Sequence, residues 1–470
     1  MVADSGREYS APQAAQDYES VAWTQASTRF ELKIAVIGAG MGGLGTALSL
    51  AKKGFTNIHV YETVTDLGFT GAGIQLAPNM ARVLSRLGCW DPIYKEATDV
   101  RAANIREGAT NETLTRVPMP NLTEKYGFPH CTGHRSSLAG RMYEACQKEA
   151  GITFHFGSRL VDIKSFGPQP EFVIKPIDGD EYIVKSDVMI ASDGIKSVTR
   201  ARILETLGHE ESEKETGQAA YRIMLTRDEM KHDPEMLALI DSDEVVRWIG
   251  EKRHIIAYPV HNHTIYNLST TQPDKNFAAA PSATYTTRGS KKVMLDVFSD
   301  FCPLIQRMLN LVPEGEVCEW RLRMHNPLPT WTMGSVALVG DACHPTLPHM
   351  SQGASMAIED GATIAEALAL SPDLKPESIS RSLKAYQLLR KDWCTNLVEM
   401  AYQCGRTLHL GEGKAKEERD RLFAEARAGN VAVVPDKWAS PKIQEKVYSN
   451  DVVSRINAEW DTLYAQTADM

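Results

Sequence analysis

A glycine-rich segment near the N-terminus has the spacing of a phosphate-binding turn. Gly38, Gly40 and Gly43 fit G-x-G-x-x-G, in which the first glycine permits the tight turn, the second lets backbone approach a pyrophosphate and the third lets a helix pack closely. The helix that follows would direct free N–H groups and its positive dipole end at the phosphates. Glu62 ends the next apolar run and could accept hydrogen bonds from ribose hydroxyls. The alternative is a glycine-rich turn that binds nothing.

Two further carboxylates follow apolar runs that are typical of buried strands. Asp193 closes the run at 187–191, and Asp341 closes the run at 335–339. Open α/β sheets bind ligands at the carboxyl ends of their parallel strands, so Asp341 could hold a ribityl hydroxyl. Each site alone is also consistent with an ordinary turn, and the glycine spacing does not distinguish NAD from FAD.

The elements that must position these residues are those of an α/β fold. Residues 32–37, 44–53 and 58–62 predict a strand, a helix and a second strand, which make one βαβ unit. Residues 216–330 instead alternate polar and apolar residues, which predicts a largely antiparallel sheet. Residues 354–370 and 379–404 have helical spacing, and the last thirty or so residues suggest one more helix.

Composition limits the classes of partner. The chain has 470 residues, with 51 Lys and Arg against 60 Asp and Glu and a net charge of −9, which argues against a nucleic-acid binder or a polybasic membrane protein. No apolar run approaches the ~18 residues of a membrane span. The eight cysteines are scattered and are expected to be free thiols in a reducing compartment. Without a secretory signal, we expect a cytoplasmic protein.

Taken in order, the motifs resemble those of the class A flavoprotein monooxygenases, which include 4-hydroxybenzoate, salicylate and 6-hydroxynicotinate hydroxylases. The resemblance covers about residues 32–405. It rests on GAGMGG (38–43), GAGIQLAPN (71–79), HRSSL (134–138), ASDG (191–194), YR (221–222), GDACHP (340–345), PHMSQGA (348–354) and IED (358–360). The family usually has glycine where this chain has Ser351, so the loop at 348–354 is expected to be stiffer.

The resemblance implies a Rossmann-like FAD-binding domain of the 4-hydroxybenzoate hydroxylase type, with an inserted antiparallel sheet for the substrate and C-terminal helices. Its expected parts are a flexible leader (1–30), a first FAD-binding part (31–215, with substrate-domain segments near 95–130), the substrate sheet (216–330), a second FAD-binding part (331–408) and a C-terminal helical extension (409–470). A homodimer is common in the family, but no segment proves one here.

The resemblance also assigns cofactor contacts. Glu62 would bind the adenosine ribose, Arg135 the ribityl and phosphate region, and Asp341 the ribityl chain. The helix that begins at Gly353 and Ala354 would point its N–H groups at the flavin, and Asp193 would serve both FAD and transiently bound NADH or NADPH. Gln75 stands where the 6-hydroxynicotinate enzymes carry histidine, and we group it with the cofactor-binding residues.

The expected reaction is hydroxylation of a phenol by a flavin C4a-hydroperoxide, which needs a dry site and a base near the phenol oxygen. The catalytic candidates are Tyr221, Arg222 and His349. Each has a structural alternative: Tyr221 as a sheet residue, Arg222 as the anchor of a carboxylate or loop carbonyl, and His349 as a loop residue facing solvent. Cys343 is expected to be a buried filler.

The sequence therefore predicts an FAD-dependent monooxygenase that uses NAD(P)H and O₂ on a phenolic aromatic acid. The motifs favour oxidative decarboxylation, in which a 4-hydroxybenzoate-like acid gives a hydroquinone-like product. The alternatives are ring hydroxylation of a larger phenolic secondary metabolite without decarboxylation, and a flavin dehydrogenase or oxidase on the same fold. The regiochemistry, the choice of NADH or NADPH and the oligomeric state stay open.

Overall fold

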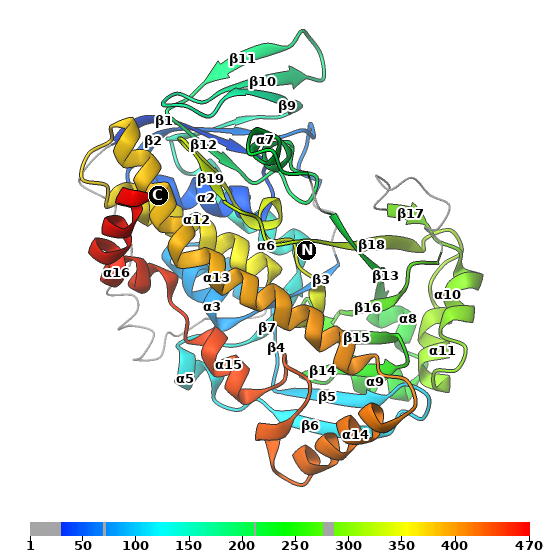
Figure 1. The fold of residues 1–470 in the computed structure, drawn as a ribbon. Helices are drawn as coiled ribbons and strands as arrows, with labels where there is room; N and C mark the ends of the chain where they lie inside the picture. Colours follow the sequence, from blue (N-terminus) through cyan, green and yellow to red (C-terminus); the bar gives the residue numbers. More distant parts are fainter. Residues whose placement is uncertain (1–29, 69–71, 211–212, 276–285) are drawn as a thin grey trace.

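The computed structural model describes residues 30–68, 72–210, 213–275 and 286–470. Two large sheets lie beside each other, and the long helix α13 (Pro376–Leu408) runs past both of them (Figure 1). Residues 1–29 of the expected leader lie outside the described residues. The structure confirms the predicted α/β class.

The first sheet has six strands in the order β19-β20-β12-β1-β2-β8. All neighbours are parallel except β19 and β20, so the carboxyl ends of β1, β2, β12 and β20 meet at one edge. The apolar runs at 32–37, 187–191 and 335–339 supply its central strands. The bounds are β1 (Phe30–Ile37), β2 (Phe55–Tyr61), β8 (Ile152–His155), β12 (Val188–Ala191), β19 (Thr332–Met333) and β20 (Val336–Leu338).

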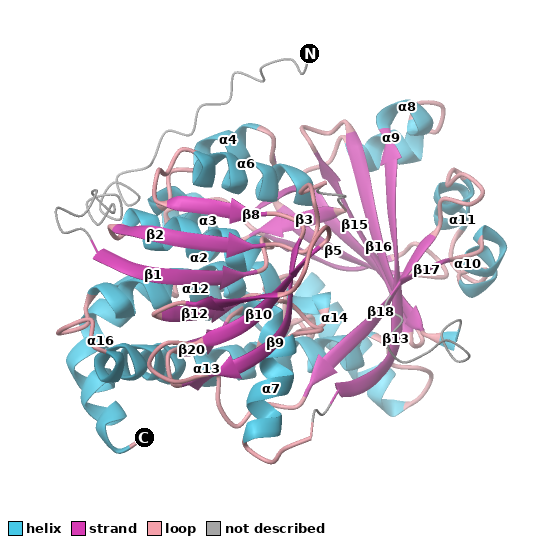
Figure 2. Ribbon diagram, turned by 90° about the horizontal axis from the view of Figure 1, so that it is seen from above, coloured by secondary structure: helices cyan, strands magenta, loops and turns pink. Residues whose placement is uncertain are grey.

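The two faces of this sheet are covered by different layers. Ile34 and Val36 pack toward the layer of α2 (Met41–Lys52), α6 (Arg135–Gln147) and α12 (Gly353–Ala369). Ala35 and Ile37, which alternate with them along β1, pack toward a small sheet of β9 (Ser158–Ser165), β10 (Glu171–Pro176) and β11 (Tyr182–Lys185) (Figure 2). Helix α2 is buried nearly all round because α12 covers the side that the sheet leaves free.

The second sheet has eight strands in the order β17-β18-β13-β16-β15-β14-β5-β6. It is antiparallel except between β14 and β5, as the alternating pattern predicted. The bounds are β5 (Ala102–Glu107), β6 (Thr113–Pro118), β13 (Glu213–Thr226), β14 (Glu244–Gly250), β15 (Arg253–Val260), β16 (Ile265–Pro273), β17 (Thr286–Arg288) and β18 (Cys318–His325).

Helices that the sequence analysis did not identify pack against one face of the second sheet. They are α8 (Arg227–Met230), α9 (Pro234–Ile240), α10 (Lys291–Val297) and α11 (Pro303–Asn310). Their signals were present, because Asp233 and Ser290 cap α9 and α10 through their side chains. These helices and the sheet enclose a separate apolar core that includes Trp248 and Phe298.

A short sheet and several helices connect the two halves. The sheet has the order β3-β7-β4, with β3 (Gly73–Leu76), β7 (Cys131–His134) and β4 (Thr98–Asp99). Helices α3 (Pro78–Arg86), α4 (Trp90–Lys95) and α5 (Leu122–Tyr126) flank it, and α7 (Val198–Thr206) follows β12. The 3-10 helices η2 (Gly340–Ala342) and η3 (Pro348–Met350) lead from β20 into α12.

The C-terminal extension (residues 409–470) returns across both halves (Figure 1). It contains α14 (Lys414–Arg427), η4 (Val431–Val433), α15 (Pro441–Tyr448), α16 (Val452–Gln466) and η5 (Thr467–Asp469). The buried ion pair of Arg86 and Asp451, with N and O atoms 2.6 Å apart, fixes it to α3. Within the described ranges, no helix has both the length and the apolar character needed to cross a membrane.

Candidate active site

The glycine turn after β1 is shaped both by the protein and by open space. Gly38 has φ +93°, and a Cβ on it would lie 2.4 Å from the Ser192 carbonyl oxygen. A Cβ on Gly43 would lie 1.9 Å from the Gly38 carbonyl oxygen. A Cβ on Gly40 would meet no atom within 4 Å. Gly38 and Gly43 therefore serve close packing, whereas Gly40 borders the space that a ligand would enter.

A cavity of about 680 Å³ opens beside this turn. It is lined by the carboxyl ends of β1, β2 and β12 and by the start of β9, and it includes Gly38, Gly40 and Glu62. The Glu62 carboxylate accepts hydrogen bonds from the backbone N–H groups of Ala39 (2.7 Å) and Val64 (3.0 Å). These bonds orient the carboxylate at the cavity wall, where the sequence analysis expected a ribose.

Asp193 closes β12 at the same cavity. One carboxylate oxygen accepts two hydrogen bonds of 3.1 Å from the N–H and hydroxyl of Thr199. The other oxygen is enclosed by protein and has no hydrogen-bond partner among the residues described. Burial raises the pKa of Asp193, and hydrogen bonds from Ser197 and Thr199 oppose that shift. The residue thus keeps an acceptor for a ligand hydroxyl or N–H group.

Asp341 and Arg135 lie near each other farther along the sheet edge. Both side chains are exposed, yet burial raises the pKa of Asp341, while the charges of His344, Arg135 and Arg200 oppose this. The Asp341 carboxylate therefore has access to solvent and is also surrounded by protein atoms, as a group on the wall of a concavity is. Arg200 supports this wall because its guanidinium donates to the Ala342 carbonyl (3.1 Å) and the Ile195 carbonyl (2.5 Å).

The N-terminus of α12 follows the loop at 348–352. Gly353 and Ala354 begin the helix, both are half-buried, and no acidic side chain occupies the first turn. The first N–H groups of the helix therefore offer a positive dipole end to a ligand. Ser351 has φ +54°, a left-handed conformation that favours glycine, so the serine strains this loop.

Tyr221 and Arg222 are neighbours on β13 and face opposite sides of the second sheet. Tyr221 is fully buried in the apolar core formed with α8 to α11. Arg222 is half-buried on the other side, near enough to Arg135 and Tyr258 for their charges to affect its pKa. The structure therefore does not bring Tyr221 to the side that carries Arg222, and we assign Tyr221 to the core.

Arg222 stacks over the ring of Trp320, with its Cζ 4.8 Å from the ring centroid. It has no hydrogen bond or ion pair among the described residues, so no structural carboxylate or carbonyl anchored by it is found there. Burial lowers its pKa, and the charge of Arg135 acts in the same direction. A guanidinium stays charged despite such a shift, so this side of the site is cationic.

His349 lies on η3 and is 1% exposed, which contradicts the solvent-facing alternative. Its ring packs against His254 and His409, with centroids 5.2 and 5.9 Å away. His254 Nδ1 and His409 Nε2 are 2.6 Å apart. Burial lowers the pKa of His349 well below its ordinary value. The structure places the predicted base in a neutral histidine cluster, with its Nε2 3.4 Å from Oε1 of Gln218 on β13.

A family model described as an FAD binding domain matches residues 31–401. The chain belongs to the class A FAD-dependent monooxygenases. It is 30% identical to the FAD-dependent monooxygenase ntnJ of Nectria sp. over 85% of this chain and 90% of the relative. It is 32% identical to 3-hydroxybenzoate 6-hydroxylase 1 of Aquipseudomonas alcaligenes over 83% of this chain and 93% of the relative.

Solved structures support the same fold. A salicylate hydroxylase substrate complex superposes with a TM-score of 0.71 at 22% identity, covering 90% of this chain and 98% of that one. Together with the family match, these findings show that the chain is an FAD-dependent monooxygenase.

The residues of the site fit FAD. The open space at Gly40 admits a pyrophosphate, and the unpartnered oxygen of Asp193 offers an acceptor beside it. Glu62 would contact the adenosine ribose. Asp341 and Arg135 would contact the ribityl chain and the phosphates. Gly353 and Ala354 would direct the positive end of the helix dipole at the flavin. These assignments of single residues stay predictions.

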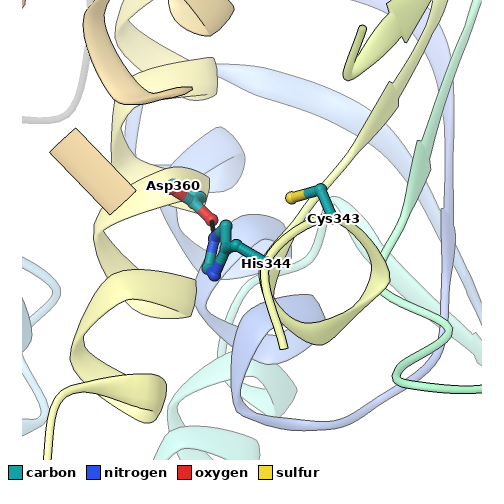
Figure 3. A group of neighbouring side chains, drawn as sticks. All are labelled: Cys343, His344 and Asp360. Atoms are coloured by element: carbon teal, nitrogen blue, oxygen red, sulfur yellow. Dashed lines mark hydrogen bonds and ion pairs between the residues drawn. The ribbon is translucent and has the colours of Figure 1, made fainter. Parts of the chain in front are cut away.

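A buried ionic network, which the sequence analysis missed, holds the loop that carries Asp341. Asp360 on α12 accepts a hydrogen bond from His344 Nε2 (2.6 Å), which Figure 3 shows. It also accepts hydrogen bonds from Arg390 Nε (2.8 Å) and from the Gly340 N–H (3.1 Å). Hydrogen bonding and charge from His344 and Arg390 lower the pKa of Asp360 against the effect of burial. The motif at 358–360 therefore anchors the end of β20 to the helix that follows it.

The same group resembles a metal site only at first sight. Cys343, His344 and Asp360 have their potential ligand atoms within 4.8 Å of one another (Figure 3). Arg390 already neutralises Asp360, and the charge and hydrogen bond of the Asp360 carboxylate hold the pKa of His344 well above its ordinary value despite burial. A protonated imidazole does not bind a metal. Burial raises the pKa of Cys343 to about 12, which fits the expected buried filler.

Gln75 lies on β3 and is 3% exposed. Its Oε1 lies 3.1 Å from Nε2 of His130. Opposite it on β7, Thr132 donates to the Pro259 carbonyl of β15 (2.6 Å). Opposite residues of an antiparallel pair share a face, so Gln75 faces the second sheet, near Tyr258.

Proposed function

We propose that this monooxygenase hydroxylates a phenolic aromatic acid, with NADH or NADPH as reductant and O₂ as oxidant. The observation that carries the proposal is Arg222, a half-buried cation on the face of β13 opposite the apolar core, with no anionic partner among the described residues. Partial removal from water makes an unpaired charge unfavourable, so an anionic ligand would stabilise it. A planar carboxylate matches the guanidinium in a two-point contact.

The protein groups around Arg222 suit a phenolic acid. Tyr258 lies beside it, and burial raises the pKa of Tyr258 far above its ordinary value, so its hydroxyl stays protonated and can donate a hydrogen bond. The ring of Trp320 holds the guanidinium from the other direction. Bound FAD supplies electron transfer from the nicotinamide to O₂, and Arg222 would hold the acid so that its ring faces the flavin. The relative named 3-hydroxybenzoate 6-hydroxylase 1 supports an aromatic acid as substrate.

The test compares acids with their neutral amides. We expect 3-hydroxybenzoate or 4-hydroxybenzoate to stimulate NAD(P)H oxidation and O₂ uptake, and 3-hydroxybenzamide and 4-hydroxybenzamide to stimulate far less. Arg222→Gln should raise the Kd of the stimulating acid about tenfold or more, because a charged hydrogen bond is lost, and should leave FAD content unchanged. Arg307→Gln is the control, since Arg307 pairs with Asp233 on the exposed surface of α11. Equal stimulation by acid and amide contradicts the proposal.

Oxidative decarboxylation is the finer prediction of the sequence. It predicts that CO₂ release equals NAD(P)H consumption with a 4-hydroxybenzoate-like acid, and that a hydroquinone-like product forms. Oxidation with product but without CO₂ would indicate ring hydroxylation that retains the carboxylate, including that of a larger phenol. Hydrogen peroxide without any hydroxylated product would indicate uncoupled turnover.

We also place the reaction in a reducing, cytoplasmic compartment. All eight cysteines are free thiols, and seven of them are buried. Such thiols persist where disulfides are kept reduced. Cell fractionation with activity measured in each fraction tests this placement.

A further inference from the structure

A buried hydrogen-bond chain joins the C-terminal extension to Gln75. The Tyr448 hydroxyl lies 3.1 Å from Nδ1 of His130, and Nε2 of His130 lies 3.1 Å from Oε1 of Gln75. The three side chains are 2%, 1% and 3% exposed, in that order. Because water does not reach these groups freely, their protons must be shared among themselves.

The direction of the chain follows from the tyrosine. A buried hydroxyl that donates no hydrogen bond is unfavourable, and Nδ1 of His130 is the acceptor that the described residues offer to Tyr448. Nδ1 must then carry a lone pair, so the ring proton lies on Nε2 and is donated to Gln75 Oε1. Burial lowers the pKa of His130 to about 3, which keeps the ring neutral with one proton.

This chain decides which end of the Gln75 amide is free. With Oε1 bound by His130, the NH₂ group points away from it. That nitrogen has no hydrogen-bond partner among the described residues, and it is not one of the polar atoms that protein encloses completely. Gly73 lies two residues before Gln75 on the same face of β3, and a Cβ on it would lie 2.7 Å from the Tyr258 ring. The Gln75 amide therefore lies on the side of β3 that faces Tyr258, the neighbour of Arg222.

We propose that Tyr448, acting through His130, orients Gln75 so that its NH₂ group donates a hydrogen bond to an anionic or carbonyl oxygen of the aromatic substrate. This inference rests on the proposed function for the existence of that substrate. Tyr448 and His130 are positioning residues, and Gln75 is the residue that selects the substrate. Together, Arg222 and Gln75 would favour a substrate that carries two separate acceptor oxygens, one for each side chain.

The C-terminal extension holds Tyr448 rigidly enough for this role. Arg82, 1% exposed on α3, donates to the carbonyl oxygens of Tyr448 and Asn450 at 3.1 Å each. The ring of Trp438 packs edge-on against His130, with centroids 5.9 Å apart. The helices at 441–466 therefore contribute to the site although they lie beyond the matched FAD domain.

The first experiment measures the tautomer directly. Holoenzyme labelled with ¹⁵N-histidine is studied by NMR at neutral pH, and His130→Gln identifies the His130 signals. We expect a neutral ring with the proton on Nε2, and we expect Tyr448→Phe to shift Nδ1 and mix the two tautomers. Tyr464→Phe, which changes a half-buried tyrosine on α16, should leave the signals unchanged. A proton on Nδ1, or a charged ring, overturns the chain.

The second experiment measures ligand selection through the flavin absorbance of the holoenzyme. With 3-hydroxybenzoate and 3-hydroxybenzamide as probes, Gln75→Glu should raise the Kd of the acid about tenfold or more and that of the amide less, because a carboxylate accepts from His130 but presents no N–H. Tyr448→Phe should raise the Kd of the acid about threefold to tenfold with FAD content unchanged.

The outcomes separate the two proposals. If Gln75→Glu changes FAD affinity but leaves the ratio of the two ligand Kd values unchanged, Gln75 serves the cofactor and the inference is overturned. If neither probe binds the unaltered enzyme, the assignment of a substrate oxygen fails together with the proposed function, while the ¹⁵N spectra still decide the hydrogen-bond chain.

Discussion

At the carboxyl ends of β1, β2 and β12, where we expect the nucleotide, backbone turns and short motifs supply most of the residues that line the cavity. Along β13 and β15, where we propose the substrate, side chains from the two sheets, η3, α13 and the C-terminal extension pack together. The first side could be predicted from consecutive residues, such as the turn from Gly38 to Gly43 and the apolar run that Asp193 closes. The second side was not, because its contacts join residues far apart in the chain, such as Tyr448 and His130, whose hydroxyl oxygen and Nδ1 are 3.1 Å apart.

The two sides of the site should differ in how well they tolerate substitutions. A contiguous turn fails when one atom is added, since its neighbours are backbone. A side-chain cluster assembled from several elements loses individual interactions while the fold persists. Four substitutions test this contrast, from the largest expected effect to the smallest.

Gly43→Ala should have the largest effect, because it should lower both stability and FAD content. Its Cβ would lie 1.9 Å from the Gly38 carbonyl oxygen, so the backbone must move, and we expect a loss of about 3 kcal/mol or more in the free energy of unfolding. Denaturant titration and the ratio of flavin to protein absorbance measure this. Gly40→Ala is the matched control, because its Cβ meets open space; it should fold normally and bind FAD more weakly. Equal stability losses in both variants would contradict the assignment.

Asp360→Asn should follow. It removes the charge between His344 and Arg390 in a fully buried network, and breaking such a group costs about 3 to 5 kcal/mol. The pKa of Asp360 is lowered and that of His344 is raised. The Asp360 carboxylate therefore stabilises the folded protein at pH values above the pKa that it has in the unfolded chain. The His344 imidazolium stabilises it fully below the unfolded pKa of histidine, and this contribution is lost only as pH rises through the raised folded pKa. The stability difference from the unaltered protein should stay constant between about pH 5 and pH 6.5 and shrink in strong acid.

His349→Gln tests the histidine cluster through its pH dependence. Burial lowers the pKa of His409 to about 4 and those of His254 and His349 well below the ordinary value of 6.5. Below about pH 6.5 the unfolded chain takes up protons that the folded chain does not, so stability falls as pH falls. In the variant, the slope of the free energy of unfolding against pH should be smaller by about 1.4 kcal/mol per pH unit, which corresponds to one proton. An unchanged slope, with loss of a near-neutral pKa from the rate profile, would instead favour a catalytic base.

Tyr221→Phe should have the smallest effect. Its ring lies in the apolar core opposite Arg222, so kcat and KM should stay within about twofold, and removal of one buried hydroxyl should cost no more than about 1.5 kcal/mol. Steady-state kinetics and thermal unfolding check both values. A loss of kcat much larger than the loss of stability would place Tyr221 in the reaction after all.

The pairing of Tyr221 with Arg222 shows one limit of the sequence analysis. Neighbouring residues on a strand point to opposite faces, so both could not face one cavity, but the sequence does not say which face is covered by helices. That depended on α8 to α11, which the sequence analysis did not identify. His349 shows the other limit, since its motif places it beside the flavin loop while His254, His409 and Gly405 decide that its ring is enclosed.

By itself, the sequence determined the class of fold, the family and the nucleotide-binding edge, because these depend on residues close together in the chain and on backbone geometry that only certain residues allow. The tertiary structure alone decided which side chains share a face of the second sheet, which histidines are held neutral, that Asp360 anchors the end of β20 to α12, and that the C-terminal extension packs against α3. These depend on contacts such as that of Arg82 with the Tyr448 carbonyl oxygen. Packing brings such partners together across hundreds of residues, and no local pattern specifies them.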